Sequence, residues 1–432
     1  MPSFPKDGIS FFAFLKMPPI LNPDTYIQGV PHAEFERLRE TDPVHWTEEP
    51  DGRGFWSLTR YADVIEASRN TAVFSSAKGI RLEDMAEDEL IARTTMMELD
   101  PPTHTTYRRM VSQPFHRREV AKYDVMMREL AREVIAGVRG KTEIDFVPEL
   151  ARQLPMRMLG KMLGVPDEDG AWMVAAGDAL IGNSDPEFTD FVVDQVDTEE
   201  FRLLPFRSPV SLKLFDFAER MAEEKRRCPA HDVAQLGRQD VITDLLAPKR
   251  DGETLSDLEF KNFFTLLVAA GNDTTRYTMA AGMHALLENP DQLALLRTQP
   301  ELMDSAVEEM LRWGTVTMHF RRTATADFQL GDKLIKVGDK VCLWFISADF
   351  DHRQFPDPYR FDITRIPNPH MAFGLKSPHK CLGEHLARLE IKVLFEELLP
   401  QLANVQLNGE IERLRSNFIS GIKHLPLAVE WV

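Results

Sequence analysis

The chain has 432 residues, of which 43% are hydrophobic, so it is long enough to bury a large core. Its 68 acidic residues outnumber its 51 basic residues and give a net charge of −17, which argues against nucleic acid or an anionic membrane as the main partner. Its three cysteines, Cys228, Cys342 and Cys381, lie far apart in the sequence. They exclude a disulfide framework and an all-cysteine iron–sulfur centre within the chain, and they suit a reducing cytosol.

The beginning of the sequence lacks the pattern of a targeting segment. Its one apolar stretch, Phe11 to Leu15, is short, is broken by Lys16 and prolines, and follows no basic region, so no signal peptide is expected. No run approaches the roughly 20 apolar residues that span a bilayer. The sequence therefore predicts a cytoplasmic protein without a membrane anchor.

Strands are predicted toward the two ends of the chain, with helices between them. The segment FWSLTR, residues 55–60, is predicted to be a strand, and apolar residues three and four positions apart predict mostly helix from about Pro101 to Pro290. A Gly331-Asp332 turn predicts a hairpin, which the strand VCLWFIS follows. Because helices and strands do not alternate, the sequence predicts a mainly helical α+β fold.

One predicted helix is unusually long. It begins with a capping box formed by Ser256 and Glu259 and ends at Asn289-Pro290. At about 1.5 Å per residue it would extend for roughly 50 Å. Its middle, AGNDTT from Ala270 to Thr275, places an acid and hydroxyls beside apolar residues, although glycine and threonine weaken a helix. These residues suit proton delivery into an apolar pocket, but a polar patch on a packed helix would have the same sequence.

Cys381 lies in the segment FGLKSPHKCLG, two residues after His379 and directly before a predicted helix. The N-terminus of a helix favours a thiolate, which is the form of cysteine that binds a metal ion. From this loop alone, Cys381 could be a buried thiol, a metal ligand or a nucleophile. A nucleophile would also need an orienting histidine–acid pair, which the sequence cannot show.

Together these segments resemble the cytochrome P-450 family of haem-thiolate monooxygenases over nearly the whole chain. The resemblance implies that Cys381 is the axial ligand of the iron in haem b and that the matching positions around it bind the cofactor. It also implies that Asp273 and Thr274 of the long helix are catalytic and deliver protons through water. The remaining matching positions are Phe373, Gly374, His379 and Gly383 in the loop and Ala270 and Gly271 in the helix.

The resemblance assigns roles to charged residues elsewhere in the chain. Glu309 and Arg312 match the family's Glu-x-x-Arg signature, and Arg360 is expected to complete a buried structural network with them. Each motif alone could be an ordinary ion pair on a solvated helix. Four residues are expected to donate charge-assisted hydrogen bonds to the haem propionates: His104, Arg108, Arg322 and His379.

The implied protein is a monomer with one cytochrome P-450 domain over residues 1–432, in which the long helix crosses over the haem. The helical part is expected at about 76–314 and 371–399. The β-rich part is expected at about 1–75, 315–370 and 400–432.

The implied reaction inserts one oxygen atom from O₂ into a hydrophobic small molecule, for which terpenoids, steroids, fatty chains and alkyl-aromatics are expected. No Gly-x-Gly-x-x-Gly follows a strand, so electrons are expected from a separate ferredoxin and its NAD(P)H-dependent reductase. Peroxide-driven or reductive chemistry and a catalytically silent haem-binding protein are the alternatives. Five basic residues are expected either to form a patch that docks an acidic ferredoxin or to be scattered solvated charges. They are Arg109, Arg117, Arg118, Lys376 and Lys380.

Residues of a substrate pocket are expected from their positions in the sequence relative to the family's motifs, although each could equally belong to the hydrophobic core. A lid is expected from Gly79–Met96, including Ile80 and Met85, and from Leu180–Ile181. The pocket candidates are Val268, Ala269, Leu180, Met318, Phe418 and Ile419.

At three places the sequence departs from the residues that are usual in the family. Ser377 replaces a glycine that lets the backbone pass close to the haem, and in the same loop Phe373-Gly374 lie one residue further from the cysteine. Thr315-Val316 and Asp349-Phe350 replace residues common after the Glu-x-x-Arg helix and in the following segment. Lysines 376 and 380 are expected to raise the reduction potential of the iron.

Overall fold

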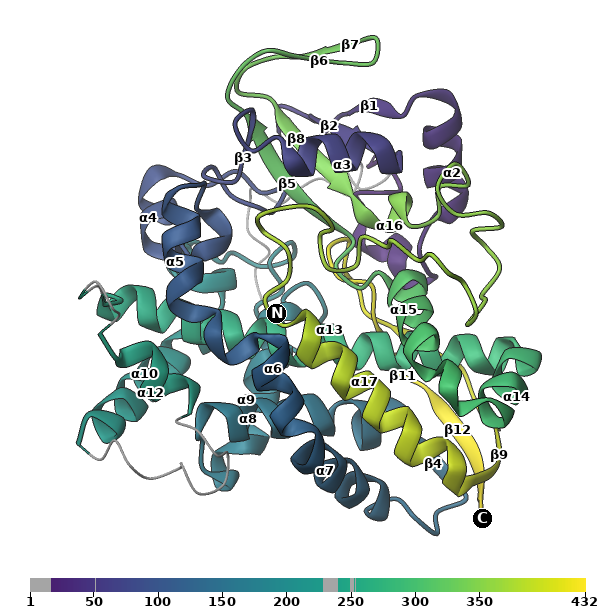
Figure 1. Ribbon diagram of the computed structural model, residues 1–432. Coiled ribbons are helices and arrows are strands. Elements are labelled where there is room, and N and C mark those ends of the chain that lie inside the picture. The colour runs from purple at the N-terminus through teal and green to yellow at the C-terminus, as the bar shows by residue number, and fades with distance from the viewer. Residues whose placement is uncertain (1–16, 51, 228–239, 249–251, 253) are drawn as a thin grey trace, which may run out of the picture.

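Figure 1 shows the computed structural model of the chain. The apolar segment Phe11 to Leu15 and Cys228 lie outside the residues that the structure describes. The described residues are 17–50, 52–227, 240–248, 252 and 254–432.

Helices form the larger part of the molecule and the largest sheet lies at one side of them, so the mainly helical α+β fold is confirmed (Figure 1). The helices are α2 (His32–Thr41), α3 (Tyr61–Arg69), α4 (Glu87–Arg93), α5 (Thr103–Val111), α6 (Arg117–Val120), α7 (Asp124–Ala136), α8 (Gln153–Leu163), α9 (Asp167–Ile181), α10 (Val210–Arg227), α12 (Val241–Leu246), α13 (Asp257–Glu288), α14 (Pro290–Thr298), α15 (Met303–Gly314), α16 (Phe345–Ala348) and α17 (Glu384–Leu398).

The largest sheet has five strands in the order β1-β2-β8-β5-β3. Strands β2 and β8 are parallel, and the other neighbours are antiparallel. The predicted hairpin is β6–β7, and a three-stranded sheet has the order β4-β12-β9. The strands are β1 (Val44–Thr47), β2 (Phe55–Leu58), β3 (Phe74–Ser75), β4 (Glu143–Asp145), β5 (His319–Ala324), β6 (Phe328–Leu330), β7 (Lys333–Ile335), β8 (Lys340–Trp344), β9 (Leu402–Leu407), β10 (Glu412–Arg413), β11 (Ile422–His424) and β12 (Pro426–Trp431).

The predicted long helix is α13, which runs for 32 residues through the middle of the molecule (Figure 1). The side chain of Ser256 accepts a hydrogen bond from the Glu259 backbone at 3.3 Å, and Glu259 Oε2 accepts one from the Ser256 backbone at 2.7 Å, so the capping box is present. The Thr274 hydroxyl donates to the Ala270 carbonyl at 2.9 Å, one turn earlier. The helix nevertheless continues without a break, and it packs against α8, α9, α10, α15 and α17.

Thr315 and Asp349, two residues that differ from those usual in the family, contact each other. The Thr315 hydroxyl lies 2.7 Å from Asp349 Oδ2, and Asp349 Oδ1 accepts a hydrogen bond from the Met371 backbone at 2.7 Å. Asp349 is fully buried, and burial raises its pKa to about 6. These bonds connect the end of α15 to the segment that leads into the cysteine loop.

Candidate active site

A cavity with about 1490 Å³ of empty space lies between α13 and the segment that precedes α17. Gly271 and Thr274 line it from α13, and Cys381 lines it from the opposite segment. The structure thus brings together the AGNDTT segment of α13 and the cysteine loop, which lie about a quarter of the chain apart in the sequence. Further lining residues include Phe373, Gly374, Ser377, His379, Arg322, Phe320, Leu266 and Glu390.

Cys381 is accessible from this cavity, and its backbone N–H donates to the Phe373 carbonyl at 2.8 Å. Burial raises the pKa of the Cys381 thiol, while the backbone N–H of Gly383 opposes that increase. Proximity to the start of α17 therefore does not by itself hold the thiolate form. A metal ion at the sulfur would, because coordination removes the thiol proton.

Ser377 fits the cysteine loop without strain. The left-handed backbone positions of the loop are Gly374, with φ of 71°, and Lys376, with φ of 60°. Ser377 is not among them, and its hydroxyl accepts a hydrogen bond from the His379 backbone at 3.1 Å. The glycine that the family usually has at this place is therefore not required here for a positive φ, because the unusual conformation falls on Lys376.

Buried nitrogen atoms at one side of the cavity have no partner. His104 is 1% exposed, and neither of its ring nitrogens has a hydrogen-bond partner among the described residues; the same holds for Nη1 of Arg108. The His104 and His379 rings lie 4.2 Å apart. Burial lowers the pKa of Arg322 to about 10 and, together with Arg322, that of His379 to about 2. Such desolvated donors fit a cofactor that carries carboxylates.

The acid and the hydroxyl of α13 point to different places. Thr274 lines the cavity, whereas Asp273 is fully buried and does not line it. Asp273 Oδ1 accepts from Asn272 at 2.9 Å and lies 3.1 Å from Arg276, which also pairs with Asp178 of α9. Burial raises the pKa of Asp273 to about 7, opposed mainly by Arg276. This carboxyl can therefore hold or release a proton near neutral pH.

Glu309 and Arg312 of α15 form a fully buried bidentate ion pair, with N–O distances of 2.7 and 2.8 Å. The expectation that Arg360 joins them is wrong. Arg365 lies 3.2 Å from Glu309, whereas Arg360 is exposed. Both arginines lie in the segment between α16 and α17. The backbone N–H of Asp362 donates to Glu309 at 3.0 Å, and this turn brings Arg365 to the carboxylate.

Comparisons with known proteins agree with this geometry. The sequence profile of the family described as cytochrome P-450 matches residues 206–410. The chain is 35% identical over 416 residues to the steroid C26-monooxygenase of Mycobacterium tuberculosis, which covers 93% of this chain and 90% of that relative. The chain is a cytochrome P-450.

Other matches have similar coverage. This P-450 is 33% identical to linalool 8-monooxygenase of Pseudomonas putida over 424 residues, which are 96% of this chain and 99% of the relative. Its structure is similar to that of a Mycobacterium marinum cytochrome P-450 in complex with pseudoionone, with a TM-score of 0.84 and 33% identity over 99% of this chain and 100% of that one. Among the described residues, no helix is both long and apolar enough to cross a membrane.

The P-450 is a monooxygenase, and its cofactor is haem b. The donor set fits this cofactor, because the accessible thiol of Cys381 and the unpartnered nitrogens of His104 and Arg108 line or adjoin one cavity. A haem with a thiolate ligand supplies an electron-rich iron that favours cleavage of the O–O bond.

A second cavity of the P-450, with about 900 Å³ of empty space, adjoins the first and shares with it Met97, Leu266, Ala270, Thr274, Thr317 and Phe320. Most of its surface is apolar, which suits a hydrophobic substrate. Of the expected residues, those that line it are Ala269, Phe418, Ile419, Ile80, Met85 and Ile181.

The expectation of a pocket role is wrong for Val268, Leu180 and Met318. All three are fully buried in the packed core and line neither cavity. On α13 the cavity face is Leu266, Ala269 and the residues one turn further, and Val268 lies off this face because a helix turns by about 100° per residue. The position of Val268 beside a functional motif in the sequence did not reveal which way it faces.

Arg81, Glu83 and Arg93 lie within the expected lid segment but were not singled out from the sequence, and Glu98 was missed; all four line the second cavity. Sequence reasoning also missed Glu390, a fully buried acid that lines the first cavity from α17. Charged residues usually indicate a solvated surface, so only the packing could show that these side chains line cavities.

The expected basic patch is partly compensated. Arg109, Arg117, Arg118 and Lys376 are exposed and have no ion pair among the described residues, but Lys380 lies 2.5 Å from Glu384. An effect of lysine charge on the reduction potential would therefore come mainly from Lys376, whose exposed charge is screened by solvent.

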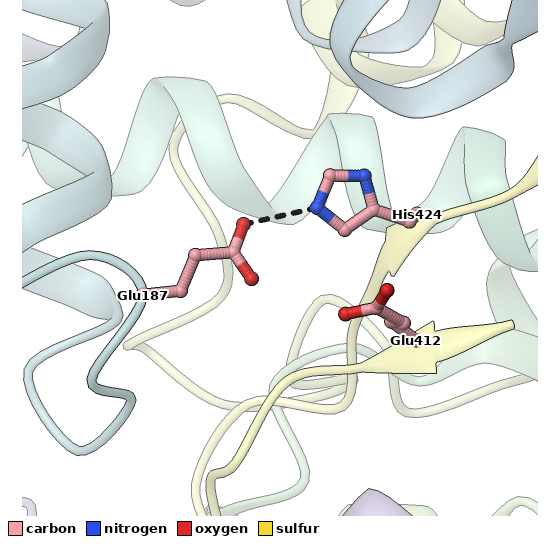
Figure 2. A group of neighbouring side chains, drawn as sticks. All are labelled: Glu187, Glu412 and His424. Atoms are coloured by element: carbon pink, nitrogen blue, oxygen red, sulfur yellow. Dashed lines mark hydrogen bonds and ion pairs between the residues drawn. The ribbon is translucent and has the colours of Figure 1, made fainter.

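Figure 2 shows a group of three potential metal ligands, Glu187, Glu412 and His424, and none of the three lines either cavity. His424 already has a carboxylate at each ring nitrogen, Asp145 at 2.6 Å and Glu187 at 3.1 Å. Glu187 is also paired with Lys423 at 2.6 Å. These side chains form an ion-pair network near the short β10–β11 sheet, and we assign no metal to them.

Proposed function

We propose that this P-450 hydroxylates a hydrophobic small molecule of the terpenoid, steroid, fatty-chain or alkyl-aromatic class with electrons from a separate ferredoxin. The observation that carries the proposal is the position of Thr274, which lines both the Cys381 cavity and the adjoining apolar cavity. A substrate in the apolar cavity would therefore approach the cofactor at Thr274. The relatives named for steroid C26 and linalool oxygenation support a C–H bond as the target.

In this proposal the residues around the first cavity hold the haem. Cys381 ligates the iron, and Phe373 and Gly374 form the adjoining wall. Gly271 allows α13 to approach Leu159 of α8 closely, since a Cβ at Gly271 would lie 3.0 Å from Leu159 Cδ2. His104, Arg108, Arg322 and His379 would donate hydrogen bonds to the carboxylates of the haem, and these bonds would offset the cost of burying the donors.

Thr274 and Asp273 would deliver the protons that the reaction consumes. The Thr274 hydroxyl now donates to Ala270, so it must turn from that carbonyl to donate into the cavity. Asp273 would replenish the proton, for which its pKa of about 7 is suited. Because Asp273 faces Arg276 and Asp178, its side chain must rotate toward the cavity to do so.

Replacing Thr274 by alanine should separate electron use from product formation. We expect Thr274→Ala to consume NAD(P)H while product per NAD(P)H falls by about tenfold or more, because the positioned hydroxyl is lost. The conservative Thr274→Ser should retain most of the coupling. The measurement is product and NAD(P)H consumption with a reconstituted ferredoxin system. Full coupling in Thr274→Ala would contradict the role of Thr274, and product formation without O₂ would contradict the monooxygenase reaction.

Exposed Arg117 and Arg118 near the cysteine side support docking of an acidic ferredoxin. We expect Arg117→Glu/Arg118→Glu to slow reduction by ferredoxin by about tenfold at low ionic strength and the effect to shrink as salt is added. Lys213→Glu on α10 is a single charge reversal outside the proposed docking surface and should have little effect. Stopped-flow reduction rates measure this, and equal, salt-insensitive rates in all three proteins would eliminate the docking surface.

A further inference from the structure

Arg81 places a cation without a partner inside the apolar cavity. It lies in the loop between β3 and α4 and lines the cavity, and its guanidinium carbon lies 5.0 Å from the ring centroid of Phe206 and 4.6 Å from that of Phe418. Within the described part of the chain, the guanidinium makes no hydrogen bond and no ion pair. The two rings therefore hold the side chain without using any of its N–H donors.

The backbone around Arg81 is fixed from outside the loop. The Arg321 backbone donates to the Ile80 carbonyl at 2.8 Å, and the Arg321 guanidinium donates to the Glu83 carbonyl at 2.6 Å. The ring partner Phe206 has a left-handed backbone, with φ of 60°, and its carbonyl accepts from Asn183 at 2.9 Å. Such strain persists only where the surroundings impose it, and it is common at ligand sites.

The other charges that line or border the cavity are already paired. Arg93 lies 2.6 Å from Glu83, and Arg207 of the adjoining segment lies 2.8 Å from Glu89. Glu98 accepts hydrogen bonds from Thr95 N at 2.9 Å and Thr95 Oγ1 at 2.7 Å, and burial raises its pKa.

Among the described residues, Arg81 is thus a cation of the cavity that forms no ion pair. Burial lowers the pKa of Arg81, although the nearby carboxylates of Glu83 and Glu98 oppose this decrease. A desolvated, unpaired charge is costly unless a ligand supplies the counter-charge.

We propose that Arg81 binds the carboxylate of an amphipathic substrate whose apolar body extends through the cavity toward Thr274. The proposal rests on the function proposed above and narrows its substrate class to hydrophobic carboxylic acids. A guanidinium matches a carboxylate with parallel N–H···O bonds, and the apolar body would contact Leu266, Ala269, Phe320 and Ile419. Because the carboxylate is held at a fixed point, Arg81 would determine which carbon lies beside Thr274.

The test compares carboxylic acids with their methyl esters, which keep the apolar body and lose the charge. Octanoate, hexadecanoate and lithocholate and their esters are titrated into the holoenzyme, and affinity is read by calorimetry and by the spin shift of the haem. We expect at least one acid to bind about tenfold or more tightly than its ester. Arg81→Gln should remove this preference by weakening the acid and not the ester, and Arg81→Lys should retain part of it.

Arg202→Gln is the matched control, because Arg202 pairs with Asp88 beside the same region and does not line the cavity. It should keep the preference for the acid. If no acid of the three binds more tightly than its ester, or if Arg81→Gln weakens acid and ester equally, the role of Arg81 is overturned. Calorimetry reports the preference whether or not the enzyme turns over, so failure here is distinct from failure of the monooxygenase proposal.

Discussion

Replacing Glu309 by glutamine is expected to destabilise the protein by several kcal/mol, because it leaves the buried Arg312 and the partly buried Arg365 without a counter-charge. Glu309 is fully buried, pairs with both guanidiniums, and also accepts hydrogen bonds from the Asp362 backbone and from Asn368, each at 3.0 Å. The substitution therefore disconnects α15 from the segment that leads to the cysteine loop. We expect loss of haem retention together with the loss of stability.

Asp304→Asn on the same helix is the matched control for Glu309→Gln. Asp304 is exposed and pairs with Lys392 at 2.7 Å, so its loss should cost less than about 1 kcal/mol. Urea unfolding of the two variants and the wild type gives the free energies, and absorbance gives the haem content. A Glu309→Gln protein that unfolds like Asp304→Asn and keeps its haem would contradict the structural role of this network.

Replacing Glu390 by glutamine is expected to change how stability depends on pH. Burial raises the pKa of Glu390 from 4.5 to about 8, opposed by the Thr275 hydroxyl, and its Oε1 has no partner among the described residues. Between these values the folded state keeps a proton that the unfolded state releases. The contribution of Glu390 to stability is thus fully present below the unfolded pKa and is lost as the pH rises through the folded pKa.

Glutamine cannot ionise, so Glu390→Gln should match the wild type near pH 5 and exceed it by several kcal/mol near pH 9. Unfolding free energies of the holoenzyme across this range measure the difference between the two proteins. Glu410→Gln, at an exposed position, should leave the curve unchanged. A constant difference between Glu390→Gln and the wild type at all pH values would show that Glu390 does not titrate in this way.

The motifs of short sequence range could be predicted because their chemistry depends on local spacing. The capping box at Ser256, the helix that begins after Cys381, and the ion pair of Glu309 with Arg312 each join residues within one or two turns. The mainly helical α+β fold followed from the same local periodicities.

The remainder depended on contacts between segments distant in the sequence. Arg365 takes the place expected for Arg360 because a turn selects it, and Met318 and Val268 face the core although they lie beside cavity residues. Arg81 could not be found from sequence, because its aromatic partners Phe206 and Phe418 come from two distant loops. The strained position of the cysteine loop likewise falls on Lys376, one residue before the missing glycine.

We infer that Cys381 ligates the haem iron as a thiolate. The most direct measurement is the absorption spectrum of the ferrous–CO complex of the purified protein, with Cys381→His as the comparison. We expect a red-shifted Soret band for the wild type and its loss in Cys381→His. A wild-type band at the position typical of a neutral axial ligand, unchanged by Cys381→His, would contradict it.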